Sequence, residues 1–490
     1  MASLRKELLT GVFFTSLAKY ASYVVQLIVT AILARLLTPE DYGVVAVATV
    51  FIAFFNLLSN IGIGPAIIQY KDLTKNDLNS IFSFTAYVGV VMTLLFYLSS
   101  WIIASYYDNS TLIPVCQILS LTILFSCLNI VPLNIQYRDK RFKLAAIASL
   151  GTNIATAIIA IVMALLNFGV YALVFQQVMS TVFLFLFFYL KVRLHFTLRL
   201  NAASLKKIMS FSVYQFLFNI INYFARNLDK LLVGRFIGMA PLGQYEKSYR
   251  MMMLPLQNLT FAITPVMQPV FSTMQNDLHL MAEKYKKLFT LLCYIGFPLS
   301  VLLFFLGKEL ILLFFGDQWT EAILPFRILA LSVGLQMLNG TTGSIYQSAN
   351  ATKQLFISGC WCGFFMVSSF AITIAGWGTI VAVSIGYVIA QLFNSAQAYY
   401  LLFKILKYPL GKILKDMFCP LVVTFIMGVA LFLIFPICES LPLIISLLFK
   451  ILVAFIVWYV FVNHVGTHKG VISDYAKSAL KGIKSRLSVK

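Results

Sequence analysis

The sequence is short of charged residues, and above all of acidic ones. Only 11% of its 490 residues are charged, and Asp and Glu number 17 against 37 for Lys and Arg. Because charged residues make up about a quarter of a typical soluble domain, this composition excludes a soluble protein. Apolar residues make up 60% of the chain, so lipid must be the solvent for most of its surface.

Three further absences narrow the function. The seven cysteines have no metal-ligand spacing and no accompanying histidines, so no metal site is expected. No glycine-rich phosphate loop follows a predicted strand, which disfavours ATP hydrolysis. The longest expected outer connection, 307–321, has no histidine and no acid–base arrangement, which disfavours a membrane enzyme such as a saccharide polymerase or ligase. The sequence therefore predicts a protein that is not an enzyme.

The net charge of +20 admits two interpretations, a nucleic-acid partner or a membrane topology signal. The basic residues gather in alternate connections between apolar stretches, as the positive-inside rule requires. Attraction to anionic lipid headgroups accounts for the rest. We therefore expect membrane lipids and no nucleic acid as partners, with both termini in the cytoplasm.

Apolar stretches of 18 or more residues recur along the whole chain, each long enough to cross a hydrocarbon core about 30 Å thick as a helix. They predict an all-α polytopic membrane protein with about 14 transmembrane helices. The expected spans are 9–36, 43–69, 79–105, 112–136, 144–166, 169–190, 208–237, 243–270, 286–306, 322–348, 355–375, 379–403, 416–436 and 441–463.

The two halves of the chain look duplicated. At a shift of 200 residues, Arg35 meets Arg235, Gly43 meets Gly243 and Pro65 meets Pro265. Two six-span units of the same orientation imply a pseudo-twofold axis along the membrane normal, with a site between the lobes. The expected domains are an N-terminal lobe over 1–192, a cytoplasmic linker over 193–207, a C-terminal lobe over 208–403, extra helices 13 and 14 over 404–463 and a cytoplasmic amphipathic tail over 464–490.

Seven basic residues fall inside predicted spans, while Asp229 and Glu246 are the only acids expected there. Exposing them all to hydrocarbon would cost on the order of 20 kcal/mol, at about 3 kcal/mol each. They must therefore line water or pair internally. Helical spacing allows Arg226 with Asp229 and Glu246 with Arg250, and two lysines at span ends allow snorkelling. The seven are Lys19, Arg226, Lys230, Lys247, Arg250, Arg327 and Lys450.

Two acids cannot neutralise seven cations, so the surplus favours an anionic substrate. The predicted contacts of the anion are Lys19, Arg226, Lys230 and Arg327. Secondary candidates for the cavity wall are Gln26, Asn219, Asn222, Asp229, Lys247, Arg250, Gln336 and Asn339. Gln336 and Asn339 belong to a span 10 rich in neutral polar groups, which suit sugar hydroxyls, although helix packing through polar residues is an equally good interpretation of them.

Four passages carry a family resemblance. They are ARLLTPEDYGVVAVA from Ala34, IGIGPAIIQYKDLTKNDL from Ile61, RNLDKLLVGRFIGMAPLGQYEKSYRMMMLPLQNL from Arg226 and FGDQWTEAILPFRILAL from Phe315. Together they resemble the Wzx-type flippases of O-antigen, capsule and exopolysaccharide units, in the multidrug/oligosaccharidyl-lipid/polysaccharide exporter superfamily. The resemblance covers nearly the whole chain.

This resemblance implies two six-helix bundles around a V-shaped cavity that alternates between inward-open and outward-open states, plus two further helices. It implies a bacterial inner membrane location and, as substrate, undecaprenyl diphosphate carrying an oligosaccharide repeat unit. It places Arg226, Asp229, Lys230 and Arg235 in a charged motif of span 7, and Arg327 in a motif of span 10. Glu246 and Lys247 depart from the family pattern, which has smaller, less charged residues there.

The resemblance implies no cofactor and leaves three energy sources open, namely the membrane potential, protons and Na⁺. Polymerase and chain-length proteins of the same pathway are further partners that it suggests. The alternative within the superfamily is a multidrug or cation antiporter. Such a protein is expected to have an acid-dominated cavity, and the residues predicted here are base-dominated.

Overall fold

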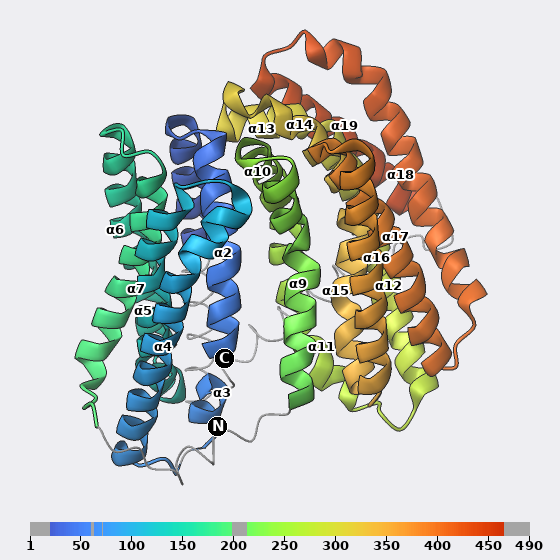
Figure 1. Ribbon diagram of the computed structural model, residues 1–490. Helices are drawn as coiled ribbons and strands as arrows, with labels where there is room; N and C mark the ends of the chain where they lie inside the picture. The colour runs from blue at the N-terminus through green and yellow to red at the C-terminus, as the bar shows by residue number, and fades with distance from the viewer. Residues whose placement is uncertain (1–19, 60–62, 71, 198–212, 465–490) are drawn as a thin grey trace, which may run out of the picture. The chain divides into compact units, whose positions relative to one another are not determined.

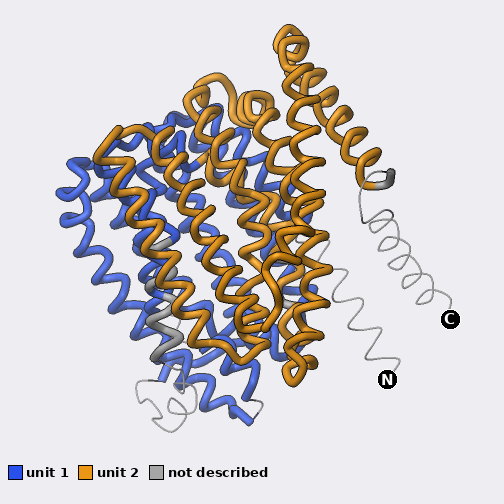
Figure 2. Tube along the Cα trace, turned by 90° about the vertical axis from the view of Figure 1, so that its right-hand side faces the viewer, with its two compact units in different colours: residues 1–246 blue, residues 247–490 orange. Residues whose placement is uncertain are grey.

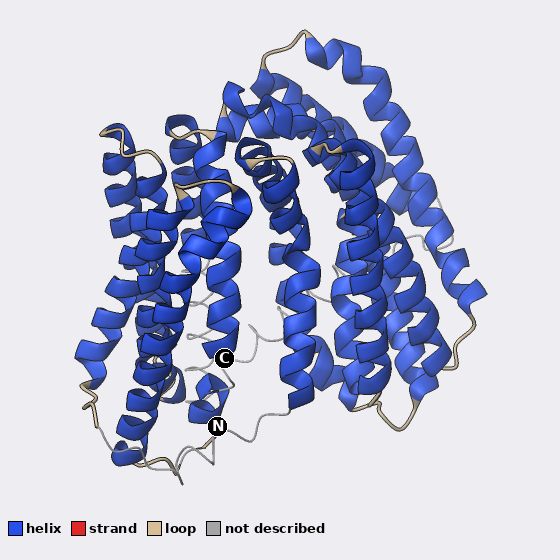
Figure 3. Ribbon diagram, viewed as in Figure 1, coloured by secondary structure: helices blue, strands red, loops and turns tan. Residues whose placement is uncertain are grey.

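The computed structural model describes residues 20–59, 63–70, 72–197 and 213–464. Within these residues the regular secondary structure is helical and no strand occurs (Figure 3). The all-α prediction is therefore confirmed. The predicted tail over 464–490 lies outside the described residues except for His464, as do the start of the first span and most of the linker.

The chain divides into two compact units, Met1–Glu246 and Lys247–Lys490 (Figure 2). The helices of the first unit are Tyr20–Leu36, α2 (Pro39–Ser59), α3 (Ile63–Gln69), α4 (Lys75–Tyr107), α5 (Leu112–Arg138), α6 (Phe142–Leu165), α7 (Val170–Val192), α9 (Val213–Phe236) and the first part of α10 (Met239–Pro255) (Figure 1).

The second unit holds the rest of α10 and the elements that follow it. These are η1 (Leu256–Thr260), α11 (Phe261–Ser272), α12 (Leu278–Phe305), α13 (Gly307–Phe315), η2 (Asp317–Ala322), α14 (Ile323–Ala330), α15 (Val333–Ser348), α16 (Thr352–Trp377), α17 (Ile380–Ile405), α18 (Leu410–Glu439) and α19 (Leu443–His464). The lobe boundaries drawn from the repeat stay a prediction.

The chain is a multi-pass membrane protein by the length and composition of its helices. In the described residues ten helices are long and apolar enough to cross a membrane. If the bent pair Asp317–Ala330 with Val333–Ser348, which meet at 54°, is counted as one broken span, the number is 11. The predicted count of 14 is compatible with this finding and stays a prediction.

Two predicted spans and one predicted loop differ from the structure. The span 43–69 is divided between α2 and α3, and the span 243–270 passes through the π-helical turn η1. Pro255 ends α10 just before that turn, and a proline removes a backbone donor from the regular helical ladder. The outer connection 307–321, expected to be a loop, contains helix α13 and the 3-10 turn η2, so that prediction was wrong.

Two of the passages that carry the family resemblance also start helices. In TPED, the Thr38 hydroxyl accepts from the Asp41 backbone N–H at 3.2 Å, and Asp41 Oδ2 accepts from the Thr38 N–H at 2.9 Å. Thr74 and Asp77 of TKND form the same reciprocal pair at the start of α4. Each pair satisfies two backbone groups that a helix start leaves unpaired. These residues therefore stabilise the fold whatever the substrate is.

Helices α2 and α10 meet backbone to backbone at two glycines of the predicted repeat. A Cβ atom on Gly43 would lie 1.9 Å from the Met239 carbonyl oxygen, and one on Gly243 would lie 1.8 Å from that of Pro39. Residues 43 and 243 differ by the predicted shift of 200, and so do residues 39 and 239, so each contact is the other one with the two repeats exchanged. A twofold relation between the repeats produces such a reciprocal pair, so the duplication seen in the sequence has a physical counterpart.

We expect Gly43→Ala to lower the free energy of unfolding by about 1 to 3 kcal/mol, because the new methyl group overlaps a backbone oxygen that cannot move alone. Gly151→Ala on α6 is the matched control, since no atom lies within 4 Å of its added Cβ. It should be neutral or stabilising by up to about 1 kcal/mol. Denaturant unfolding of the purified proteins measures both, and equal effects would contradict the backbone contact.

Candidate functional site

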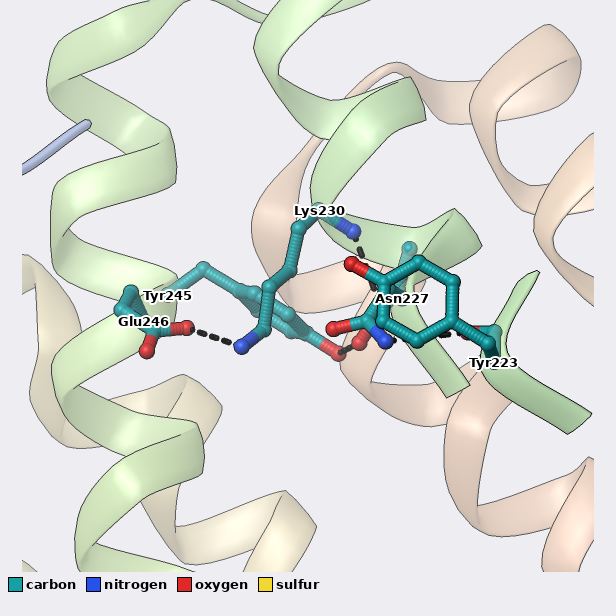
Figure 4. Close-up of polar contacts among 6 residues, drawn as sticks. Tyr223, Asn227, Lys230, Tyr245 and Glu246 are labelled. Atoms are coloured by element: carbon teal, nitrogen blue, oxygen red, sulfur yellow. Dashed lines mark hydrogen bonds and ion pairs between the residues drawn. The ribbon is translucent and has the colours of Figure 1, made fainter. Parts of the chain in front are cut away.

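Arg226, Asp229 and Lys230 form the charged row of α9. Two side-chain contacts join this row to α10 (Figure 4). Lys230 Nζ lies 2.8 Å from Glu246 Oε2. Asp229 is only 1% exposed, and its Oδ2 accepts a hydrogen bond from the Tyr245 hydroxyl at 2.9 Å. The Lys230 backbone N–H donates to the other oxygen of Asp229 at 2.9 Å. Both acids expected in the membrane are therefore engaged, and they connect two helices.

The pairings considered along single helices are replaced by pairings between helices. Neither Arg226 with Asp229 nor Glu246 with Arg250 is among the ion pairs of the described residues. Lys230 forms an ion pair with Glu246 instead. Arg226 and Arg250 are both exposed and have no ion pair in the described part of the chain. A positive surplus is thus left on α9 and α10, as the residue count predicted.

Arg235 lies at the end of α9, where it binds α4. Its guanidinium lies 2.5 Å from Asp108 Oδ2 and 5.2 Å from the centre of the Tyr106 ring. The Tyr107 hydroxyl also donates to the Leu231 carbonyl at 3.2 Å. The resemblance implies that Arg235 belongs to a charged motif, and in this structure its contacts hold two helices together.

Arg327 lies in the second unit, beside a buried ion pair. Lys450 Nζ lies 2.5 Å from Glu309 Oε1 and donates to the Phe305 carbonyl at 3.1 Å. Ser446 donates to the same Glu309 oxygen at 2.6 Å. Glu309 and Lys450 are 3% and 1% exposed, so the interpretation of Lys450 as a snorkelling residue was wrong. Glu309 is thus a buried acid of α13, in a segment that was expected to be a loop.

The space beside Arg327 is small. Its guanidinium lies 5.6 Å from the centre of the Phe435 ring, and it shares a cavity of about 20 Å³ with Lys308, Glu309 and Lys450. A cavity of that volume admits about one water molecule. It does not admit a diphosphate in this conformation, so a contact of Arg327 with the substrate stays a prediction.

Three other candidates of the second unit are held by their neighbours. Lys247 is 1% exposed and lies 5.0 Å and 5.1 Å from the ring centres of Phe315 and Trp319. Gln336 donates to Ser332 at 2.8 Å and accepts from Tyr387 at 3.1 Å.

Asn339 donates to Ser395 at 2.8 Å and is half-buried. These polar groups of α15 therefore serve helix packing in this structure, which is the second of the two interpretations given to them. Their part in sugar binding stays a prediction.

Four candidates remain to be placed. Gln26 is exposed on the helix Tyr20–Leu36. Asn219 and Asn222 lie on α9, but their side chains lie outside the described residues, as does all of Lys19. Glu309, the rings that cover Lys247 and an apolar cavity between α2, α4 and α9 were not predicted from the sequence. The sequence signal available for the cavity was four phenylalanines that line it, three on α2 at 51, 54 and 55 and one on α9 at 224.

The described residues are helical and include ten helices long enough to cross a membrane, one of which buries the cation Lys450, and this is the architecture of a membrane transporter. The chain belongs to the polysaccharide biosynthesis protein family, whose profile matches residues 32–324.

Two curated relatives agree with this assignment. The teichuronic acid biosynthesis protein TuaB of Bacillus subtilis (strain 168) is 24% identical over 88% of this chain and 90% of its own length. The lipopolysaccharide biosynthesis protein WzxC of Escherichia coli (strain K12) is 25% identical over 82% of each chain. The resemblance inferred from the four sequence passages is thereby confirmed.

A solved structure shares the fold. The lipid II flippase MurJ in an inward closed conformation superposes with a TM-score of 0.70 at 17% identity, over 92% of this chain and 98% of its own. At 17% identity, this similarity shows that the two proteins arrange their helices alike.

Proposed function

We propose that this protein is a flippase for an undecaprenyl-diphosphate-linked oligosaccharide, the repeat unit of an O-antigen, capsule or exopolysaccharide. It moves the unit from the cytoplasmic to the outer leaflet of the bacterial inner membrane by alternating access. Both termini lie in the cytoplasm, because that topology puts most of the 37 basic residues there. Polymerase and chain-length proteins of the same pathway would act on the delivered unit.

The observation that carries this proposal is the exposed Arg226 near the middle of α9. It has no ion pair in the described part of the chain, and it lies one helical turn from Lys230. A lone guanidinium at membrane depth costs at least about 3 kcal/mol in hydrocarbon, so it must meet water or an anion. The bidentate donors of arginine match a phosphate group.

A polar, cationic site lowers the barrier to flipping. A sugar hydroxyl taken unpaired into hydrocarbon costs about 4 to 8 kcal/mol, so a whole repeat unit faces tens of kcal/mol without a protein. Arg226 and Lys230 replace water around the diphosphate, while the apolar tail stays in lipid. With the cell interior negative, moving two negative charges outward is favourable by a free energy of about 4 to 5 kcal/mol per 100 mV of membrane potential. The membrane potential is thus a sufficient energy source in this proposal.

The antiporter alternative requires an acid that a cation can reach. Asp229 is 1% exposed and accepts from Tyr245, and Glu309 is 3% exposed and paired with Lys450. Glu246 is bound by Lys230. In the part of the chain that the structure describes, Arg226 and Arg250 are the exposed charges of α9 and α10 that have no ion pair, so the site favours an anion over a drug cation. A transporter of this design needs no catalytic group.

Deleting the gene from its host and restoring it on a plasmid tests the function. We expect the deletion to accumulate lipid-linked repeat units on the inner leaflet and to remove the finished polysaccharide from the surface, and we expect the plasmid to reverse both changes. Radiolabelled lipid extracts and surface staining measure the two quantities. Normal surface polysaccharide in the deletion strain, with no accumulated intermediate, would overturn the proposal.

A further inference from the structure

Basic residues gather where three neighbouring helices of the first unit, α5, α6 and α7, come together (Figure 1). The buried Ala145 and Phe188 share one apolar cluster with Leu133, which joins the end of α5, the start of α6 and the end of α7. The segments 138–143 and 191–193 at these ends hold six cations and one acid. The six cations form the basic cluster of the first unit: Arg138, Lys140, Arg141, Lys143, Lys191 and Arg193.

The charge of the basic cluster is largely left over within the chain. Arg138 Nε lies 4.0 Å from Asp139 Oδ1, a distance at the limit of ion pairing. Lys140, Arg141 and Arg193 are exposed and have no ion pair in the part of the chain that the structure describes. An anion from outside the chain therefore meets several cations at one place.

The turn between α5 and α6 has a structural counterpart in the second unit. In the first unit, the N–H groups of residues 139–141 donate to carbonyls of residues 135–137 at 2.9, 3.1 and 2.8 Å. In the turn between α15 and α16, each of these three bonds recurs 210 residues later with the same length. The two repeats thus build the same backbone turn at this point.

The two turns differ in charge. Asn350 and Ala351 occupy the positions that Lys140 and Arg141 occupy in the first unit. Lys140 and Asn350 both have a left-handed backbone, with φ angles of 59° and 55°. Asparagine adopts this conformation more readily than lysine does. Because a neutral sequence makes the same turn with a better suited residue, folding does not account for the two cations.

Membrane topology accounts for only part of the basic cluster. The positive-inside rule requires an excess of cations on the cytoplasmic side, where the proposed topology places both turns. The segment 348–353 of the second unit has one cation, Lys353, whereas the matching segment 138–143 has four. Topology therefore explains the sign of the charge and not its concentration in the first unit.

Exposed apolar side chains extend from the basic cluster along α6 and α7. Ile147, Ile154 and Ile158 are exposed and share one face of α6. Leu186 and Leu190 are exposed one turn apart at the end of α7. Both helices are long and apolar enough to span a membrane, so these side chains contact acyl chains. Cations above an apolar face are complementary to a phospholipid with an anionic headgroup.

We propose that the basic cluster binds a phospholipid with an anionic headgroup, whose acyl chains lie along α6 and α7. Its phosphate stays at the cytoplasmic surface, where Arg141 and Arg193 offer the paired donors that suit a phosphate group. The neutral turn of the second unit lacks these cations. The site is therefore local and saturable, unlike the general attraction of a basic protein to an anionic membrane.

Copying the neutral turn into the first unit tests the proposal. Lys140→Asn with Arg141→Ala gives the first turn the residues of the second, which already make this turn in the same chain. Lys284→Gln with Lys287→Gln removes two exposed cations from the start of α12 and is the matched control. Purified full-length proteins in an uncharged detergent are titrated with dioleoyl phosphatidylglycerol and dioleoyl phosphatidylcholine. Mass spectrometry of the intact complexes counts the bound lipids.

We expect phosphatidylglycerol to bind the unchanged protein and the α12 control alike. It should bind the turn variant about thirtyfold more weakly, because each cation near a membrane surface contributes a factor of about five. Phosphatidylcholine should bind all three proteins equally weakly. The melting temperature of the turn variant should not fall, because asparagine suits the left-handed position. Should that variant fail to fold, Lys191→Gln with Arg193→Gln takes its place, with the same expected loss.

Two results with phosphatidylglycerol would overturn the proposal. The first is undiminished binding by the turn variant or by its replacement. The second is an equal loss in the turn variant and the α12 control, because it assigns the binding to overall charge.

Undecaprenyl phosphate distinguishes a resident lipid from the transported one. It should bind the unchanged protein and the turn variant alike. If it binds the unchanged protein more tightly than phosphatidylglycerol does and loses this affinity in the turn variant, the basic cluster belongs to the substrate lipid and the proposal is wrong. None of these measurements needs transport, so their outcome does not depend on the proposed function.

Discussion

Arg226→Gln is expected to slow the arrival of lipid-linked saccharide in the outer leaflet by about ten- to a hundredfold. The change removes one charge-assisted contact to phosphate, which is worth about 1.5 to 3 kcal/mol. Stability should stay within about 0.5 kcal/mol of the unchanged protein, because Arg226 is exposed and has no ion pair in the part of the chain that the structure describes. Translocation in cells and unfolding of the purified protein measure the two effects.

Two further variants separate charge from shape at this position. Arg226→Lys keeps the positive charge and should retain part of the rate. Lys353→Gln removes a charge from an exposed residue at the start of α16 and should leave the rate unchanged. If Arg226→Gln lowers stability and rate together, or if all three variants transport normally, Arg226 does not contact the substrate.

Lys450→Met is expected to have the largest effect on stability, lowering the free energy of unfolding by about 3 to 5 kcal/mol. Removing one member of a buried pair leaves the carboxylate of Glu309 without its counter-charge at 3% exposure. The double variant Lys450→Met with Glu309→Met should recover most of the loss, because a pair of apolar residues has no charge to desolvate. Thermal unfolding of the three proteins measures this coupling.

The double variant also tests whether the Glu309–Lys450 pair takes part in transport. Glu309 and Lys450 join α13 to α19 and lie outside the charged row of α9. We therefore expect the double variant to transport at nearly the normal rate once it is folded. A double variant as unstable as the single one would show that the two side chains do not depend on each other.

The fold class was predictable because hydropathy acts locally. A helix in lipid must form its backbone hydrogen bonds within itself. Each long apolar run therefore indicates a span, whatever the rest of the chain does. The row on α9 was predictable for the same reason, since residues three and four apart share a helical face. Thr38 with Asp41, and Thr74 with Asp77, are also local and belong to recognisable capping patterns.

The pairing of charges was not predictable, because it is decided between helices. Lys450 and Glu309 are 141 residues apart in the sequence and 2.5 Å apart in space. Lys230 had Arg226 and Asp229 as neighbours on its own helix, yet it binds Glu246 of α10. A sequence gives the number of charges and not their partners, so it overestimated the cations available to a substrate.

The segment 307–321 shows a second limit. Its charges and glycines suggested a loop, but Gly307 lets α13 begin against Arg327, where a Cβ would lie 2.6 Å from the Arg327 Cγ atom. A glycine can mark either such a close approach or a turn, and composition alone does not distinguish the two. The apolar cavity between α2, α4 and α9 was not predictable either, since its walls come from three helices that are distant in sequence.

Translocation by the purified protein in vesicles tests the central claim most directly. The vesicles contain undecaprenyl diphosphate with a labelled oligosaccharide, and a saccharide-cleaving enzyme is added outside. With the unchanged protein and an imposed membrane potential, we expect the cleaved fraction to rise steadily beyond the share that starts in the outer leaflet. Protein-free vesicles and vesicles with Arg226→Gln should stay near that share. A cleaved fraction that is the same in all three would contradict the account.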